Sequence, residues 1–313
     1  MRDSIFIEAP AKVNLALAVG PVDPSDALCR HRICSWMVGV ELYDDLTITP
    51  LESDRFSRYA TIWHREAARK TDIDWSITRD LAVRAHLLLE QETGRRMPIQ
   101  LKNEKRIPVG AGLGGGSSDA AGVLIGCNQL FDLELSIEEL AALGRRLGSD
   151  VPFFLRAQSS IARGFGDEIE SAVLPRPMHF VLLFPEFGCD TASVYASFDA
   201  LVAESGLSSV DLSGRLEDAE SGFVTDGSGA GSGRISPFNH LMLAAFRAQP
   251  ELRRLRDEIS NLIDLPVHMT GSGSTLFAIC DTDIHAEFIA EAVNGSISEV
   301  RAVVAGIHKS PVF

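Results

Sequence analysis

The sequence predicts a protein of mixed α and β structure, divided into two domains. Its 313 residues are about twice the usual length of one domain, and hydrophobic residues make up 45% of the chain, enough for sizeable cores. Segments with the alternation of strands lie between segments with the period of helices. We place the domain boundary at Pro175–Pro177, so that one domain covers residues 1–174 and the other residues 175–313.

The composition argues against several classes of protein. The chain carries 29 basic and 43 acidic residues and a net charge of −14, which disfavours a general nucleic-acid binder because such proteins neutralise phosphates. No apolar run approaches the roughly 18–20 residues that a membrane-spanning helix needs. The five cysteines form no Cys-x-x-Cys pair, so we expect free thiols in a reducing cytoplasm. Both a monomer and a homodimer remain open.

The N-terminal part is predicted to consist mainly of strands. Apolar residues alternate over Ile5–Val19, and Lys12 and Asn14 share the opposite face. A lysine in this position is as consistent with guarding a sheet edge as with a functional site. Strands are also expected over Arg32–Thr49, with a turn at residues 43–45.

A helix and a short strand are expected next, over Asp80–Glu90 and Pro98–Asn103. The strand would deliver the chain to a glycine-rich stretch that begins at Ile107. Lys105 and Arg106 precede this stretch directly, so we expect them to be close enough to help with a nucleotide.

The glycine-rich stretch Ile107–Leu124 is the most distinctive part of the chain. Its glycines permit close approach to the backbone, and a helix is expected to start near Ser117 or Ser118, which are good N-caps. The N–H groups and the dipole at a helix start favour an anion such as a phosphate. We therefore interpret the stretch as a phosphate-binding loop, whose binding residues are Pro108, Gly110, Gly112, Leu113, Gly114, Gly115, Gly116, Ser117 and Ser118.

Three other interpretations fit this stretch less well. A flexible linker would not be bounded by Ile-Pro-Val and an apolar helix, and a standard P-loop requires Lys-Ser or Lys-Thr after the glycines. A dinucleotide fingerprint matches at Gly110, Gly112 and Gly115, with Glu134 at a suitable distance for a ribose contact. That fingerprint must follow a buried strand, whereas residues 102–108 are polar and interrupted by proline.

Asp150 is predicted to lie at a corner between a helix and a strand. The helix begins with a capping box at Ser136–Glu139 and ends near Gly148. Pro152 disfavours helical backbone at Val151, so the chain is expected to become extended there. An aspartate in such a place is often a simple turn residue.

The C-terminal part is predicted to alternate between strands and helices. Thr191 and Tyr195 are four residues apart and share one face of a helix. Residues 204–234 are rich in Gly, Ser and Asp and are interpreted as a flexible surface insertion. The expected elements are a glycine turn at 162–167, a strand at 179–185, helices from 191, 237 and 250, a glycine–serine turn at 267–278, a helix at 284–293 and a strand at 298–307.

Four segments, in order, resemble the motifs of the GHMP kinases, which include galactokinase, homoserine kinase and mevalonate kinase. They are Pro10–Leu15 (Pro-Ala-Lys-Val-Asn-Leu), Pro108–Ala121 with its Gly-Gly-Gly-Ser-Ser-Asp-Ala-Ala run, Leu147–Phe154 (Leu-Gly-Ser-Asp-Val-Pro-Phe-Phe) and Val267–Ala278. The resemblance implies an α+β fold with an N-terminal domain like domain 2 of ribosomal protein S5 and a ferredoxin-like C-terminal domain.

The same resemblance implies roles for individual residues. Asp150 would be the catalytic base, Lys12 would lie beside the hydroxyl of the substrate and Asn14 near the substrate. ATP would bind the glycine loop with help from Lys105, together with Mg²⁺. The metal would be held by phosphates and waters, with Ser117 or Ser118 as candidate ligands and no protein ligand firmly assigned.

The acceptor side shows departures from the family. The family segment Asp-Gly-Tyr-His contacts a cytosine ring, whereas this chain has Asp-Ala-Leu-Cys-Arg-His at Asp26–His31, so that His31 matches and Arg30 replaces the tyrosine. Thr191 and Tyr195 match residues that flank the cytidine. Asp80 stands where the family has asparagine near the adenine.

The glycine-loop variant is most similar to the family branch that phosphorylates the 2-hydroxyl of 4-diphosphocytidyl-2-C-methyl-D-erythritol in the non-mevalonate isoprenoid precursor pathway. The resemblance therefore implies an ATP-dependent kinase with this small-molecule substrate and without a nucleic-acid or membrane partner. The alternatives are another small-alcohol kinase of the mevalonate or homoserine type, a catalytically silent nucleotide-binding protein, and a nicotinamide-dependent oxidoreductase.

Overall fold

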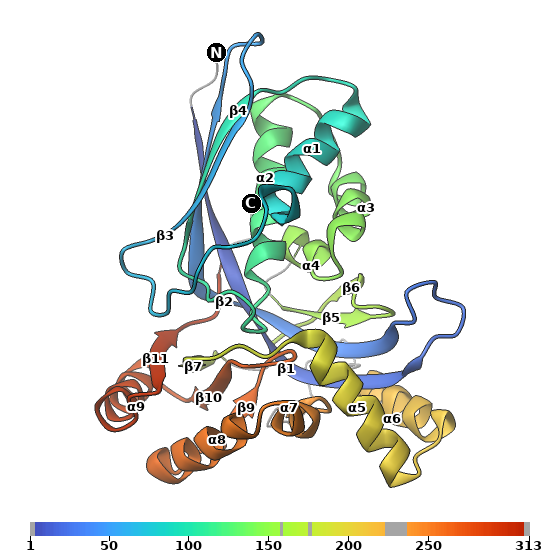
Figure 1. Ribbon diagram of the computed structural model, residues 1–313, viewed down its shortest axis with the longest axis vertical. Helices are drawn as coiled ribbons and strands as arrows, with labels where there is room; N and C mark the ends of the chain where they lie inside the picture. The colour runs from blue at the N-terminus through green and yellow to red at the C-terminus, as the bar shows by residue number, and fades with distance from the viewer. Residues whose placement is uncertain (1–3, 157–158, 175–176, 223–236, 310–313) are drawn as a thin grey trace.

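The computed structural model describes residues 4–156, 159–174, 177–222 and 237–309 (Figure 1). Within these ranges the strands form one sheet of seven strands and one of four. No helix in the described ranges is both long enough and apolar enough to cross a membrane.

The seven-stranded sheet is built on two long antiparallel strands. Its strands are β1 (Ile5–Val22), β2 (His31–Pro50), β3 (Arg58–Trp63), β4 (Ile99–Lys105), β5 (Ser159–Arg163), β6 (Glu168–Ser171) and β8 (Phe238–Asn239). They follow the order β3-β4-β2-β1-β8, and β5 and β6 extend the sheet from β2. The pairing register of β1 and β2 shifts between Pro10 and Ala11, as at a β-bulge.

The predicted turn at residues 43–45 is wrong, because β2 continues through it as a single strand of 20 residues. Tyr43 pairs with Pro10 and Asp44 with Ala9 of β1. The carboxylate of Asp44 also accepts the backbone N–H groups of Arg106 and Ile107. Asp44 and Asp45, which resemble a turn in the sequence, therefore lie in a strand beside a bulge. Their carboxylates accept hydrogen bonds from Arg106 and Ile107.

Helices cover one face of this sheet (Figure 1). They are the one-turn η1 (Ile77–Arg79), α1 (Leu81–Thr93), α2 (Gly115–Leu130), α3 (Ile137–Leu147) and α4 (Val151–Arg156). Buried side chains of α2, such as Val123 and Leu124, share one core with Ile7, Leu46 and Ile48 of the sheet. This packing fixes the start of α2, and with it the end of the glycine loop, above the two long strands.

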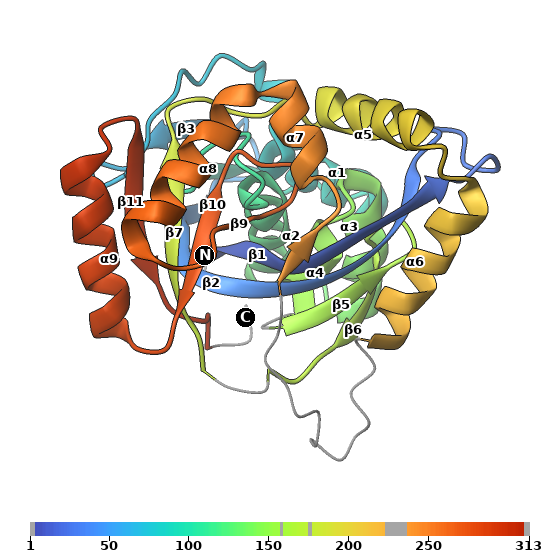
Figure 2. The ribbon, with the colours of Figure 1, turned by 90° about the horizontal axis from the view of Figure 1, so that it is seen from below.

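The four-stranded sheet belongs to the C-terminal part. Its strands are β7 (His179–Pro185), β9 (His268–Met269), β10 (Leu276–Cys280) and β11 (Val300–Ala305), in the antiparallel order β11-β7-β10-β9. Its helices are α5 (Thr191–Ser205), α7 (Met242–Ala248), α8 (Pro250–Ile263) and α9 (Asp283–Ser296). Figure 2 shows α7, α8 and α9 gathered about this sheet, with α5 beside the far end of β1.

The two sheets meet through a shared apolar core. Val13 and Val38 of the first sheet pack in one cluster with Phe180, Leu182 and Phe277 of the second. The two-residue strand β8 pairs with β1 in parallel. The long strands β1 and β2 therefore contribute to the cores of both halves of the molecule. Lys12 and Asn14 lie on β1 where the halves meet.

The predicted flexible insertion at 204–234 is wrong for residues 209–222, which form helix α6 (Ser209–Gly222). Leu212 and Leu216 of α6 are buried, and a Cβ on Gly20 of β1 would lie only 2.9 Å from Leu216. The polar composition of the segment obscures this narrow apolar face. Residues 223–236, like the predicted boundary residues 175–176, lie outside the described ranges.

Candidate active site

Two cavities meet beside the glycine loop. The loop cavity, of about 530 Å³, is lined by residues of the glycine loop together with Trp75, Asp80, Leu81 and Lys105. The Lys12 cavity, of about 730 Å³, is lined by Lys12 and Asn14, by Asp150, and by Arg30, His31, Phe165 and Tyr195. Gly112, Gly114 and Thr191 line both cavities, so the two form adjoining parts of one site.

The glycine loop presents the start of α2 to the loop cavity. The helix begins at Gly115, with Gly114 as its N-cap at φ +73°, so the predicted start at Ser117 or Ser118 is two or three residues too late. Glycine alone adopts this left-handed conformation without strain, which lets the helix start earlier than the serines. The first intrahelical bond joins the N–H of Ser118 to the Gly114 carbonyl. The amides of Gly115, Gly116 and Ser117 precede it at the wall of the loop cavity, as an anion-binding helix start requires.

The C-terminal glycine–serine turn supports the loop from behind. A Cβ on Gly112 would lie 2.5 Å from the carbonyl oxygen of Thr270, and the N–H of Thr275 donates to the Ala111 carbonyl at 3.3 Å. The hydroxyl of Thr270 donates to Oδ1 of Asn14 at 3.1 Å. Glycine is therefore required at position 112 by the contact between the two motifs.

Lys12 is buried and its ammonium is held in a fixed position. Nζ donates to the Gly112 carbonyl at 2.7 Å and to Oδ1 of Asn14 at 2.6 Å, and it lies 3.9 Å from Oδ2 of Asp150. Burial lowers the pKa of Lys12, while the charge of Asp150 acts in the opposite direction. The amide of Asn14 is oriented by donation to the Ser35 hydroxyl at 2.7 Å.

Asp150 directly precedes α4, so the expected strand after it is wrong. Val151 and Pro152 are helical, because proline is tolerated in the first turn of a helix, where its missing N–H has no intrahelical role. The buried Phe153 and Phe154 anchor the turn. The carboxylate of Asp150 stays partly exposed, with a relative side-chain exposure of 30%, which leaves it accessible from the Lys12 cavity.

Arg30 lines the Lys12 cavity, and its guanidinium is held by two neighbouring side chains. Its guanidinium donates to both carboxylate oxygens of Asp26, from Nε at 3.0 Å and from Nη2 at 2.8 Å. It also stacks over the ring of Phe165, with Cζ 4.2 Å from the ring centroid. Phe165 did not emerge as a site residue from the sequence; the only hint is an aromatic within the short glycine turn at 162–167.

His31 and Tyr195 lie side by side in the same cavity. Their ring centroids are 5.3 Å apart. Nδ1 of His31 lies 2.8 Å from the Gly20 carbonyl, and Nε2 lies 3.2 Å from Oδ1 of Asp199. Thr191 and Tyr195 line this cavity together, as their spacing predicts, and the Thr191 hydroxyl lies 2.9 Å from that of Ser272.

Lys105 lines the loop cavity but is held by two carboxylates. Nζ donates to Asp44 and, at 2.6 Å, to Asp119 of α2. Burial raises the pKa of Asp119 to about 7, against the opposing charge of Lys105. These contacts join β2, β4 and α2 beneath the loop. A direct contact of Lys105 with the nucleotide stays a prediction, and Lys105 is among the residues that line the loop cavity. Arg106 likewise pairs with Asp45.

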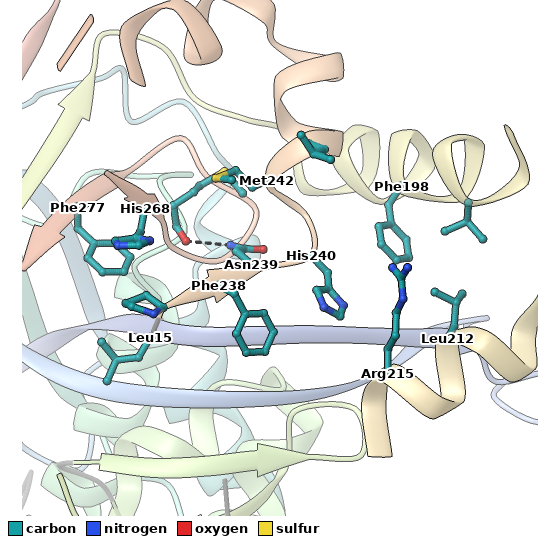
Figure 3. A pocket seen from close by; sticks show the side chains of 14 residues that line it. Leu15, Phe198, Leu212, Arg215, Phe238, Asn239, His240, Met242, His268 and Phe277 are labelled. Atoms are coloured by element: carbon teal, nitrogen blue, oxygen red, sulfur yellow. Dashed lines mark hydrogen bonds between the residues drawn. The ribbon is translucent and has the colours of Figure 1, made fainter. Parts of the chain in front are cut away.

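A third cavity, of about 550 Å³, lies on the other side of α5 and is separate from the site (Figure 3). It is largely apolar and is lined by Leu15, Phe198, Phe238 and Phe277 among others. Asn239 in its wall donates to the carbonyls of Met269 and, at 2.8 Å, Gly271. The cavity wall therefore contributes to the position of the turn that supports the glycine loop.

Comparisons with known proteins agree with this geometry. The family model for the GHMP kinases N terminal domain matches residues 80–158, and the one for GHMP kinases C terminal matches residues 224–298. A 4-diphosphocytidyl-2-C-methyl-D-erythritol kinase of Exiguobacterium sibiricum is 32% identical over 300 residues, which cover 96% of this chain and 97% of the relative. The enzyme of that name from Paenarthrobacter aurescens is 29% identical, over 92% of this chain and 89% of its own.

Solved structures agree as well. The crystal structure of a 4-(cytidine 5'-diphospho)-2C-methyl-D-erythritol kinase superposes with a TM-score of 0.70 at 29% identity, over 98% of this chain and 100% of that one. Homoserine kinase from Cytophaga hutchinsonii gives a TM-score of 0.65 at 16% identity, over 98% of this chain and 96% of that one, and so shares the fold alone. The predicted α+β fold with N- and C-terminal GHMP kinase domains is confirmed.

Proposed function

Because the chain belongs to the GHMP kinase family, we propose that it transfers the γ-phosphoryl group of ATP to the 2-hydroxyl of 4-diphosphocytidyl-2-C-methyl-D-erythritol. The observation that carries this proposal is the pair formed by Lys12 and Asp150, 3.9 Å apart. The pair belongs to the Lys12 cavity, next to the glycines that line both cavities. A phosphoryl donor in one cavity and an alcohol in the other would meet there.

The glycine loop would bind the triphosphate. The amides of Gly115, Gly116 and Ser117 and the positive end of α2 favour an anion, and the loop is held in place before the nucleotide arrives. Phosphoryl transfer depends mainly on positioning and charge stabilisation. A loop that is already ordered reduces the reorganisation needed in the transition state.

Asp150 would accept the proton of the attacking hydroxyl. Its carboxylate is partly exposed, so a substrate hydroxyl can reach it, whereas Lys12 is buried and fixed by Asn14 and Gly112. The ammonium of Lys12 favours the ionised form of Asp150 and stabilises negative charge that develops on the hydroxyl oxygen. Such general-base and electrostatic contributions are typical of alcohol kinases in which the protein forms no covalent intermediate.

Mg²⁺ is the expected partner of the nucleotide. No group of three or more His, Cys, Asp or Glu side chains in the described ranges is arranged to hold a metal, so phosphates and waters would supply most ligands, as is common for Mg²⁺. Ser117 fits a direct ligand because it lines the loop cavity and its hydroxyl lies near Gly148, two residues before Asp150. Ser118 is buried and does not line that cavity. The ion would neutralise charge on the triphosphate.

Arg30 and Tyr195 would hold the cytosine. The bonds that the Arg30 guanidinium donates to Asp26 fix its edge, and Phe165 covers one of its faces, so the other face would be available to a flat base. Guanidinium planes and aromatic rings both stack on nucleobases. His31 is held by Gly20 and Asp199 beside Tyr195, where it would support the ring, and Thr191 lies one helical turn away on the same cavity wall.

The domain division is part of this proposal. Apart from the two-residue β8, which pairs with β1, each half supplies the strands of its own sheet. This supports an N-terminal nucleotide-binding domain over residues 1–174 and a C-terminal domain over residues 175–313. No two of the five cysteines, all of which lie in the described ranges, are joined in a disulfide. Thiols persist in a reducing cytoplasm, where we place this enzyme.

The proposal is tested by measuring ATP turnover with three acceptors: 4-diphosphocytidyl-2-C-methyl-D-erythritol, mevalonate and homoserine. We expect turnover with the cytidine-linked acceptor alone. Turnover with mevalonate or homoserine instead would assign another member of the family. ATP binding without turnover of any acceptor would indicate a silent nucleotide-binding protein.

A further inference from the structure

Trp75 is an aromatic residue of the loop cavity that neither the motifs nor the proposed catalytic groups include. It lies in the segment between β3 and α1, just before η1. Among the described residues that line the loop cavity it is the only aromatic one. Its neighbours in the lining include the apolar Leu81, Ile107 and Val109, so this part of the cavity offers apolar surface next to an indole.

The indole of Trp75 is tied to a fixed carboxylate. Nε1 donates to Oδ2 of Asp80 at 3.3 Å. The same oxygen accepts the Thr61 hydroxyl at 3.0 Å, and Oδ1 caps α1 by accepting the N–H of Ala82 at 2.9 Å. Asp80 therefore links β3, α1 and the indole, and its acceptor atoms are largely used within the protein. This explains why aspartate, which has acceptors on both oxygens, suits a position where the family has asparagine.

The position of Trp75 in the cavity determines which part of a nucleotide it can meet. Trp75, Asp80 and Leu81 line the loop cavity but not the Lys12 cavity. The transferred phosphoryl group must lie near the shared residues Gly112 and Gly114, next to Asp150. The base of the nucleotide, at the other end of the triphosphate, is then directed towards the part of the cavity that Trp75 lines.

We propose that Trp75 is the stacking platform for the adenine of ATP, with Asp80 as the positioning residue that holds its indole. This inference rests on the proposed function in taking ATP as the nucleotide. An adenine ring needs a flat apolar partner for its face, and a tryptophan supplies the largest one. Truncating an aromatic that stacks on a base weakens binding by roughly 5- to 100-fold, the equivalent of about 1–3 kcal/mol.

The test compares two ligands on three variants. ATP carries the base, whereas inorganic tripolyphosphate carries the phosphates alone and serves as the probe of the glycine loop. Trp75→Ala removes the platform, and Trp75→Phe keeps a smaller ring. Trp63→Phe is the matched control, because the Trp63 indole donates to the Thr71 carbonyl at 2.6 Å and does not line the cavity. Binding is measured by calorimetry, so no acceptor substrate is needed.

We expect Trp75→Ala to weaken ATP binding by roughly 5- to 100-fold and to leave tripolyphosphate binding unchanged. Trp75→Phe should recover most of the lost ATP affinity. Trp63→Phe should bind both ligands as the natural protein does. ATP should also quench indole fluorescence in the natural protein and in Trp63→Phe, and much less in Trp75→Phe. Equal losses for both ligands would show that Trp75 only supports the fold, and unchanged ATP binding would remove it from the site. A protein that binds ATP in this way but phosphorylates no cytidine-linked acceptor would overturn the proposed function and leave this inference standing.

Discussion

The two cavities of the site are built from different parts of the chain. The loop cavity is formed largely by one continuous stretch, Pro108–Ser117, whose backbone supplies the binding groups. The Lys12 cavity is formed by side chains from β1, the loop before β2, the turn between β5 and β6, and α5. Its Arg30, Phe165 and Tyr195 are brought together only by the fold.

This difference determines how each cavity tolerates change. A site made of backbone amides depends on the backbone geometry of the loop, and at Gly112 a side chain is excluded because the Thr270 carbonyl oxygen lies 2.5 Å from where a Cβ would be. A site made of side chains can exchange one flat group for another, as the arginine at position 30 indicates. We therefore expect substitutions to have large effects at the loop and at the junction of the cavities, and graded effects on the acceptor side.

The largest effect is expected at the junction. Asp150→Asn should keep the fold and ATP binding but lower kcat by roughly 10²–10⁴-fold, the usual range for loss of a general base. Steady-state kinetics together with calorimetry for ATP measure this. Lys12 remains in place in this variant, so a kcat close to that of the natural protein would remove Asp150 from the mechanism.

The second prediction compares two glycines of the loop. Gly112→Ala should weaken ATP binding more than tenfold and lower the free energy of unfolding by about 1–3 kcal/mol, since it strains a φ of +77° and drives a Cβ to 2.5 Å from the Thr270 oxygen. Gly116→Ala is the matched control. Its Cβ would meet only Leu81, at 3.6 Å, within a helix where alanine is favoured over glycine.

Thermal unfolding and ATP titration distinguish the two variants. If Gly112→Ala were as stable and bound ATP as well as Gly116→Ala, the contact between the loop and the C-terminal turn would not determine the loop geometry. A valine at Gly114 would be less informative, because its Cβ would first meet the ring of Phe154, at 2.8 Å, and disturb the core rather than enter the cavity.

The same contrast explains what could be predicted from the sequence. The loop, Lys12 and Asp150 lie in short contiguous motifs, so local patterns and family resemblance were sufficient to find them. Phe165 and Trp75 lie in connecting segments, and only tertiary pairing brings them to the cavities. The start of α2 and the course of β2 differ from the prediction for a related reason, since a left-handed glycine and a bulge override what local propensity favours.

The third prediction concerns the aromatic face of the acceptor cavity. Tyr195→Ala should raise KM for the cytidine-linked acceptor by roughly tenfold or more, because a stacked base loses about 1–3 kcal/mol on such a truncation. KM for ATP should not change, since Tyr195 lines only the Lys12 cavity. Tyr195→Phe keeps the ring and should behave nearly as the natural protein, and an increase in KM for ATP would contradict the separation of the two cavities.

The smallest effect on KM for the acceptor is expected at Arg30, where we infer that a guanidinium stands in place of the tyrosine ring of the family. Arg30→Ala should raise KM for the acceptor several-fold, less than Tyr195→Ala, because Phe165 would remain beside the emptied position and still offer a ring. Arg30→Tyr should keep KM within a few-fold of the natural value, since it restores a common stacking partner for a base.

Asp26→Asn is the accompanying variant, because it keeps Arg30 but weakens the two bonds that fix the edge of the guanidinium. Acceptor KM should then rise only slightly, in the order Asp26→Asn, Arg30→Ala, Tyr195→Ala. If Arg30→Tyr were inactive and Arg30→Ala lost far more than Tyr195→Ala, Arg30 would be binding an anionic group through its charge, and the cytosine would have to be held by other residues of the cavity.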